Sequence, residues 1–196
     1  TGYTEAMTDP SYRGQNLMFT YPLIGNYGVD YQSSQSDEIQ AEGVIVHEDC
    51  EKPAGNGDSK TLEQFLEENG KRGISKVDTR LLTVKIREEG SVKSAIVVGK
   101  DADKQIAIKE AKNQPHISEM DLVSEVTTEK MKKISGDGPR IALIDTGVKE
   151  NILKNLKERG FEILIFPADT SPGEIESFSP DAIFLSNGPG DPIRAE

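Results

Sequence analysis

The first two-thirds of the chain mixes short apolar runs with amphipathic segments. Three runs are apolar or β-branched and are bounded by Gly, Pro or polar residues, which predicts strands at 16–20, 43–48 and 94–99. Apolar residues at helical spacing, together with capping residues, predict three helices. The first runs from Thr61 to Gly70, the second has an apolar stripe of Leu82 and Ile86 and stops at Gly90, and the third runs from Asp101 to about Lys112.

From residue 141 onward the hydrophobic pattern is more regular. The segments IALID (141–145), FEILIFP (161–167) and DAIFLS (181–186) are predicted strands. A helix is predicted over 148–160, and a short one after Pro172. The alternation of strands and helices predicts parallel βαβ units with right-handed crossovers. The fold class expected from the whole pattern is α/β.

A change in composition marks a boundary between two domains. The segment SGDGP (135–139) contains two glycines and a proline and separates a charged stretch from a new apolar strand. We therefore expect one domain over residues 1–133 and a second over 139–196.

Three loops are expected at one edge of the second domain. Parallel strands place their carboxyl ends together, and open α/β sheets bind ligands there. The loops are DTG (145–147), PADT (167–170) and SNGPGDP (186–192). The glycines of the last loop allow a ligand to approach the main chain, whose N–H groups could face a developing negative charge. An ordinary tight turn explains the same residues about equally well.

Composition excludes several classes of partner. The formal net charge of −11 and the pI near 4.8 oppose binding to phosphate backbones and anionic lipids, so neither nucleic acid nor a membrane is expected as a partner. The sequence shows no apolar run of spanning length and no signal segment, which favours a cytoplasmic protein. Because the first residue is Thr1 and not Met, we expect the true start to lie upstream.

The sequence gives little support for a disulfide, a metal site, a cysteine nucleophile or a nucleotide-binding motif. Cys50 is the single cysteine, so no intrachain disulfide is expected. His47 and Cys50 have metal-like spacing, but the other histidine, His116, is distant in sequence, and no metal site is predicted. Cys50 also lacks the small neighbours of a nucleophile elbow. The first βα turn of the second domain offers only Gly147 for a dinucleotide fingerprint, and there is no Walker A motif.

The amino-terminal residues carry a specific resemblance. The segment TGYTEAMTDPSYRGQNLMFTYPLIGNYGV (1–29) closely resembles the glutamine-hydrolysing small subunits of carbamoyl-phosphate synthetases. The segments VDTR (77–80), EVTT (125–128) and FLSNGPGDP (184–192) resemble later landmarks of that family, in the family's order. The resemblance covers essentially the whole chain.

The resemblance implies a fold and an activity. The fold would be the small subunit's mixed α/β amino-terminal domain, followed by the first βαβαβ part of a flavodoxin-like class I glutamine amidotransferase domain. In the family, glutamine is hydrolysed to glutamate and ammonia. The ammonia reaches a large subunit that uses ATP and bicarbonate to make carbamoyl phosphate for pyrimidine and arginine synthesis. ATP and a divalent metal are expected on the large subunit of this heterodimer, and no cofactor is expected in this chain.

The resemblance also assigns site residues. The family's thiolate nucleophile, in a G-x-C-x-G elbow, and its His and Glu partners are not in this sequence, which therefore resembles a partial one and has no catalytic residue of its own. Ser11 resembles a residue that contacts glutamine across an interdomain cleft. Gly188 and Gly190 resemble backbone glutamine contacts, and Gly188 would donate its N–H to the oxyanion hole. Thr146 stands where some relatives carry an aromatic residue, and we expect this difference to affect packing.

Two other functions remain open. A non-catalytic binding or regulatory module could use the same fold, and a reading frame continuing into G-x-C-x-G with later His and Glu would favour the enzyme. A flavin binder would need a first βα loop that cradles phosphate, and DTGVK (145–149) is poor for that purpose.

Overall fold

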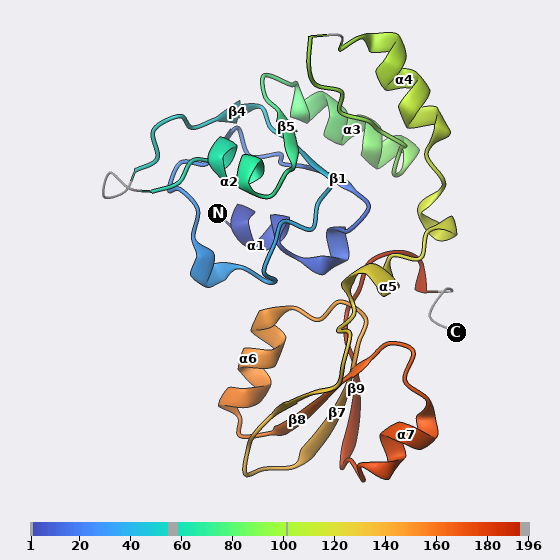
Figure 1. Cartoon of the computed structure of the whole chain (residues 1–196). Coiled ribbons are helices and arrows are strands. Elements are labelled where there is room, and N and C mark those ends of the chain that lie inside the picture. The colour runs from blue at the N-terminus through green and yellow to red at the C-terminus, as the bar shows by residue number, and fades with distance from the viewer. Residues whose placement is uncertain (1, 55–58, 101, 193–196) are drawn as a thin grey trace. The chain divides into compact units, whose positions relative to one another are not determined.

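The computed structural model describes residues 2–54, 59–100 and 102–192, and its contacts divide the chain into two units between Glu119 and Met120 (Figure 1). The boundary expected from the sequence, at 135–139, lies closer to the carboxyl terminus than this division. Residues 120–134 belong with the second unit because strand β6 (Lys132–Ile134) pairs with strand β8 (Glu162–Pro167). The division therefore falls in a segment without glycine, where composition gives no signal of a boundary.

The first unit contains a small parallel sheet of order β1-β3-β5 and a separate parallel pair, β2-β4. The strands are β1 (Asn16–Met18), β2 (Leu23–Ile24), β3 (Gly43–Ile45), β4 (Glu48–Asp49) and β5 (Arg72–Ile74). The helices are α1 (Tyr3–Met7), α2 (Leu62–Glu68), α3 (Thr79–Glu89) and α4 (Lys104–Asn113), with 3₁₀ turns at Pro10–Tyr12, Tyr31–Ser33 and Ile117–Glu119.

The core of the first unit joins α1 and α2 to the central strand β3. Tyr3, Met7, Val44 and Phe65 are among its buried side chains. The Tyr3 ring stacks on Tyr27 at 4.4 Å between centroids, and burial raises the pKa of the Tyr3 hydroxyl above its ordinary value. The apolar residues of 1–29 therefore serve mainly to build this core.

The second unit is built on a four-stranded sheet of order β6-β8-β7-β9. Strand β7 (Arg140–Asp145) is parallel to both β8 and β9 (Ala182–Leu185), whereas β6 runs antiparallel to β8. Helix α6 (Glu150–Glu158) follows β7, α7 (Pro172–Ser177) follows β8, and α5 (Val123–Val126) precedes β6. The three predicted strands and the parallel βαβαβ order are confirmed.

Alternating side chains place two cores on the two faces of this sheet. Ile163 and Ile165 pack with residues of α6, whereas Leu164 and Phe166 pack with Ile175 of α7. Figure 1 shows α6 and α7 on opposite faces of the sheet. Because both faces are covered, β7 and β8 read as nearly continuous apolar runs, which is why the sequence pattern identified them.

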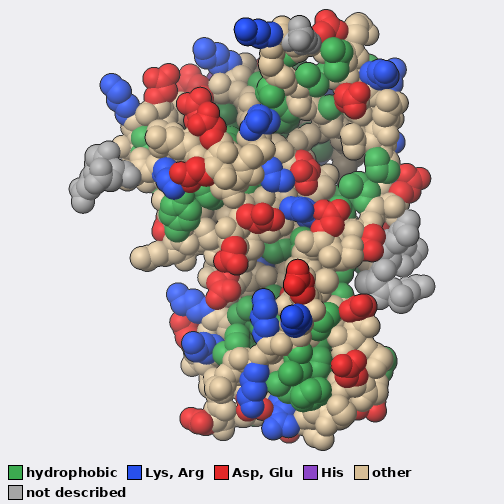
Figure 2. All heavy atoms as spheres, viewed as in Figure 1, with side chains coloured by type: hydrophobic (Ala, Val, Ile, Leu, Met, Phe, Trp, Pro, Cys, Tyr) green, Lys and Arg blue, Asp and Glu red, His purple; other side chains and the backbone are tan. Residues whose placement is uncertain are grey.

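The two edges of the sheet differ in character. Strand β6 begins with Lys132 and Lys133, and lysines on an edge strand oppose pairing with another chain. On β9, Ile183 is 62% exposed and Leu185 is 64% exposed. Acidic and basic side chains are interspersed over each unit (Figure 2). No helix in the described part of the chain is long and apolar enough to cross a membrane.

Two expectations for the first unit differ from the structure. Residues 94–99 do not form a strand; instead the Asn16 side chain donates a hydrogen bond to the Ser94 hydroxyl at 2.9 Å, and Val98 is 52% exposed. Helix α4 starts at Lys104, after the Asp103 cap, rather than at Asp101, which lies outside the described residues. The capping box of α2, from Thr61 to Gln64, is confirmed.

A carboxylate links three strands of the second unit and gives its stability a pH dependence. Glu162 of β8 accepts from Lys133 Nζ at 2.8 Å and from Arg140 Nε at 2.6 Å. These two cations, Lys133 foremost, hold the pKa of the Glu162 carboxyl below its ordinary value. Its stabilising effect is therefore present above the ordinary glutamate pKa and is lost as the pH falls through the lowered one.

We expect Glu162→Gln to lower the unfolding temperature of the second unit at about pH 7, and the difference to shrink as the pH falls through the lowered pKa of Glu162, because the wild-type side chain then becomes neutral as well. Scanning calorimetry of the two proteins across this range measures the difference. A deficit that persists unchanged in acid would show that the Glu162 charge is not its cause.

Candidate functional site

The loops after β7, β8 and β9 lie at the carboxyl edge of the second unit's sheet, where the sequence predicts a ligand site. Asp145, the last residue of β7, is 6% exposed. Its Oδ1 accepts from the Gly147 and Val148 N–H groups at 3.0 and 2.8 Å, and its Oδ2 accepts from the Thr128 N–H at 2.9 Å. One carboxylate therefore fixes the β7 turn and attaches the segment before β6 to it.

Thr127 makes a second connection at this edge. Its hydroxyl donates to the Asp145 carbonyl at 2.6 Å and accepts from the Ala168 N–H at 2.9 Å. The ends of β7 and β8 are thus joined through a side chain from the segment that precedes both strands. With Asp145, this contact makes the edge a connected set of hydrogen bonds, which rigidifies the loops it carries.

Thr146 connects the β7 turn to the loop after β9. Its N–H donates to Ser186 Oγ at 3.0 Å, and its hydroxyl lies 2.9 Å from the Ser186 carbonyl oxygen and 3.0 Å from that of Asn187. The Asn187 side chain donates back to the Gly147 carbonyl at 3.0 Å. The expectation that Thr146 matters through packing was incomplete, because its hydroxyl bonds directly to the loop.

Gly188 allows these two loops to approach each other closely. A Cβ atom added at this position would lie 2.0 Å from the Thr146 carbonyl oxygen and 2.9 Å from its carbonyl carbon. Real Cβ atoms do not come this close to backbone, so any larger residue must displace one of the loops. Glycine at 188 is therefore required by the contact between the loops, whatever ligand the edge binds.

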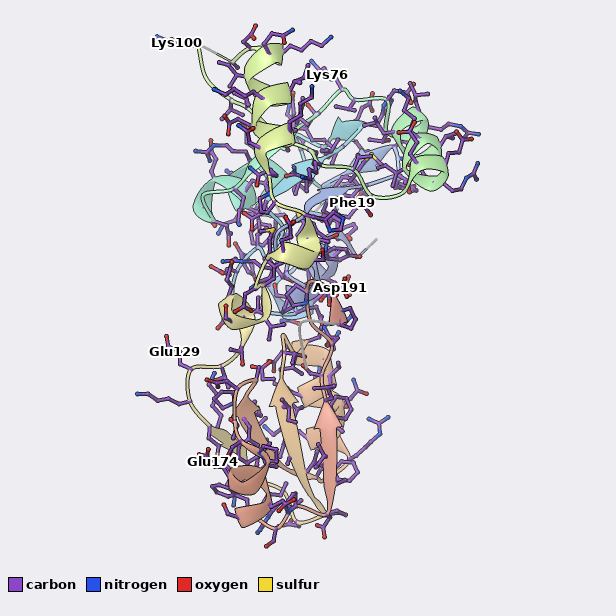
Figure 3. All side chains as sticks on the ribbon, turned by 90° about the vertical axis from the view of Figure 1, so that its right-hand side faces the viewer. Phe19, Lys76, Lys100, Glu129, Glu174 and Asp191 are labelled. Carbon is purple, nitrogen blue, oxygen red and sulfur yellow. The ribbon has the colours of Figure 1, made fainter. Side chains whose placement is uncertain are left out.

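The Gly188 N–H is an available donor. Gly188 is exposed, and no acceptor within residues 2–54, 59–100 and 102–192 bonds its N–H. Gly190 in the same loop has φ +83°, a left-handed conformation that favours glycine. Asp191 follows it and lies beyond the carboxyl end of β9, whereas Glu174 lies beside the sheet on α7 (Figure 3).

Ser11 belongs to the first unit and the two glycines to the second. It lies in the 3₁₀ turn Pro10–Tyr12, where its N–H donates to the Asp9 carboxylate at 2.9 Å. Its carbonyl accepts from the Gln15 side chain at 3.1 Å. These bonds give Ser11 a defined place in a turn, and its contact with glutamine stays a prediction.

The residues considered for metal or thiol chemistry have other contacts. His47 Nδ1 lies 2.9 Å from the Val77 carbonyl oxygen, and Cys50 Sγ lies 3.3 Å from that of Lys52. His116 Nδ1 lies 2.7 Å from Ser118 Oγ. The described ranges contain no group of three or more His, Cys, Asp or Glu side chains placed to hold a metal ion.

Sequence reasoning placed Asp145 in a loop of this edge, and Thr127 and Thr128 in a segment that resembles the family, but it assigned no role to any of the three. The one available signal was positional, since Asp145 and Thr146 are polar residues that directly follow an apolar strand. Thr127 and Thr128 lie in the EVTT segment, whose structural partners are distant in the sequence. Their roles become visible only when β6 and β7 are placed in one sheet.

The two parts of the chain match two families. Residues 1–96 match the family described as "Carbamoyl-phosphate synthase small chain, CPSase domain". Residues 142–196 match "Glutamine amidotransferase class-I". The site edge therefore lies in the part of the chain that is similar to amidotransferases.

Individual relatives are similar over the whole chain. It is 48% identical over 204 residues to the carbamoyl phosphate synthase small chain of Methanosarcina acetivorans, a match that covers 100% of this chain and 55% of the relative. It is 44% identical over 197 residues to that of Archaeoglobus fulgidus, with the same two shares covered. The corresponding protein of Caldanaerobacter subterraneus is 41% identical over 195 residues, covering 100% of this chain and 52% of the relative. The chain thus spans about half the length of these curated relatives.

Proposed function

Because the chain belongs to the family of carbamoyl phosphate synthase small chains, we propose that it is part of a subunit that hydrolyses glutamine and supplies ammonia for carbamoyl phosphate synthesis. The net reaction of this subunit is glutamine plus water to glutamate plus ammonia. Identity of 41–48% over the whole chain supports the assignment. The division into two units, one matching each family, is consistent with it.

The observation that carries the proposal at atomic level is the open Gly188 N–H. Attack on the glutamine side-chain amide produces a tetrahedral intermediate with a negative oxygen. A fixed N–H directed at that oxygen stabilises charge that appears only as the transition state forms. Gly188 is exposed and its N–H has no acceptor within the described residues, so it is available for this role.

The remaining assignments follow the family resemblance. We propose that Ser11 and the Gly190 backbone contact glutamine, and that the nucleophile and its His and Glu partners belong to sequence beyond these 196 residues. The partner is a large subunit that binds ATP and a divalent cation and uses bicarbonate. The product serves pyrimidine and arginine synthesis in the cytoplasm. No cofactor is assigned to the residues present here.

Two assays on the complete small chain with its large subunit test the proposal. Carbamoyl phosphate should form from glutamine, and it should also form from added ammonia without any contribution of the small chain. Cys50→Ala should change neither rate, because the Cys50 thiol lacks an elbow and lies against the Lys52 carbonyl. Synthesis from ammonia with none from glutamine would contradict the proposed activity and favour a non-catalytic binding module.

A further inference from the structure

Two hydroxyl groups converge on one carbonyl oxygen in the loop after β9. Thr146 Oγ1 lies 3.0 Å from the Asn187 carbonyl oxygen, and Ser186 Oγ lies 2.8 Å from it. Thr146 comes from the turn after β7, about forty residues earlier. Its hydroxyl has one proton, which it shares between this oxygen and the Ser186 carbonyl oxygen at 2.9 Å, so both contacts hold the loop from outside. Thr146 is 8% exposed, and water competes little for its hydroxyl.

This carbonyl belongs to the same peptide unit as the Gly188 N–H. A peptide unit is planar, and in the trans form its C=O and N–H point in opposite directions. The described residues contain no cis peptide bond. Holding the Asn187 oxygen on the inner side of the loop therefore directs the Gly188 N–H to the opposite side, where no acceptor in the described residues takes it.

Backbone contact limits the remaining freedom of this peptide. The Gly188 Cα faces the Thr146 carbonyl so closely that a Cβ would lie 2.0 Å from the carbonyl oxygen. The Thr146 N–H in turn donates to Ser186 Oγ at 3.0 Å. Thr146 thus holds the loop through its N–H and its hydroxyl, and its carbonyl lies against Gly188. The hydroxyl is the part that a substitution can remove alone.

We propose that the hydroxyls of Thr146 and Ser186 are positioning groups that orient the Asn187–Gly188 peptide so that its N–H serves as the oxyanion donor. The proposal rests on glutamine hydrolysis at this loop, as argued above. Hydrogen bonds to the carbonyl also polarise the amide and strengthen its N–H as a donor. In this proposal both hydroxyls act on the transition state through the Gly188 N–H and make no bond of their own to glutamine.

The test measures glutaminase kcat and KM in the complete small chain bound to its large subunit. Thr146→Val keeps the side-chain shape and removes the hydroxyl. It should lower kcat about tenfold, less than the 10²- to 10³-fold loss expected when an oxyanion donor is removed entirely, and leave KM within about twofold. Thr146→Ser restores the hydroxyl and should recover most of kcat. Ser177→Ala, which removes a hydroxyl bond to Glu174 on α7, is the matched control.

A double substitution tests whether the two hydroxyls act on the same peptide. Ser186→Ala alone should lower kcat several-fold, and Thr146→Val with Ser186→Ala should approach the loss for a missing donor, because neither hydroxyl then holds the carbonyl. The fraction of large subunit that carries the small chain, measured by gel filtration of each preparation, reports the amount of intact complex. Ser186→Ala and Thr146→Ser keep the test decisive if Thr146→Val does not fold.

The outcomes separate this proposal from the proposed function. A wild-type chain without glutaminase activity contradicts the function itself. An active wild type whose Thr146→Val variant keeps full kcat, or changes KM alone, overturns the positioning role and leaves the function standing. A Thr146→Ser variant as impaired as Thr146→Val also overturns it, since shape and not the hydroxyl would then be required.

Discussion

Replacing Gly188 by alanine in the complete small chain is expected to lower kcat for glutamine hydrolysis by about 10²- to 10³-fold, or roughly 3 to 4 kcal/mol of transition-state stabilisation. The added Cβ would meet the Thr146 carbonyl oxygen at 2.0 Å, so the loop must move away from the β7 turn. That movement displaces the Gly188 N–H from its position. Steady-state glutaminase kinetics and carbamoyl phosphate formation from glutamine both measure the loss.

Ammonia-dependent synthesis should largely survive Gly188→Ala, because added ammonia bypasses the loop. Gly173→Ala is the matched control: a Cβ at Gly173 in α7 meets nothing within 4 Å, and alanine is a better helix former than glycine. Failure of the Gly188→Ala chain to bind the large subunit, measured by gel filtration, would show that Gly188 serves folding or subunit assembly. The loop would then be a structural turn.

Asp145→Ala is expected to destabilise the second unit by about 3 kcal/mol or more. The buried carboxylate accepts from the N–H groups of Gly147, Val148 and Thr128, and alanine would leave all of them without this acceptor. Each buried donor that loses its partner costs about 1 to 3 kcal/mol, and entry of water reduces the sum. The substitution removes the bond from the Thr128 N–H to the β7 turn, whereas the Thr127 hydroxyl can still donate to the backbone carbonyl of residue 145.

Hydrogen exchange is the suitable probe of Asp145→Ala, because the tyrosines at 3, 12, 21, 27 and 31 lie in the first unit and the chain contains no tryptophan. Exchange should accelerate at the amides of β7 and β8 and remain unchanged in α2. Asp169→Ala, at an exposed position after β8, is the control and should leave exchange near wild type. Unaltered protection of β7 in Asp145→Ala would contradict the structural role of the carboxylate.

The fold was predictable where a strand is buried on both faces of its sheet, because such a strand consists of a long run of apolar residues. Strands β7 and β8 are of this kind, and the parallel βαβαβ order followed from them. Strands β5 and β6 were missed because Arg72, Lys132 and Lys133 occupy exposed edges, where pairing is mainly between backbones and side chains carry little pattern. Residues 94–99 have the composition of a strand, but they lack a paired neighbour in the structure.

The candidate site was predictable as a loop but not as a set of contacts. Two glycines after an apolar strand, at the edge where parallel strands end, sufficed to select 186–192. The reason for glycine at 188 is the Thr146 carbonyl, and no local rule connects residues so far apart in sequence. The same holds for Thr127, whose partners are the ends of two later strands. The contact of Ser11 with glutamine stays a prediction that rests on the family resemblance.

The antiparallel position of β6 has a consequence for synthesis on the ribosome. Strand β6 emerges before β7, but its partner β8 follows about thirty residues later, a delay of about 2 to 6 seconds at ordinary elongation rates. During this interval the segment has no native neighbour. Its lysines keep it hydrated and repel other nascent strands of the same kind. The lysines that kept β6 from being predicted as a strand thus also oppose aggregation of the nascent chain until β8 has been synthesised.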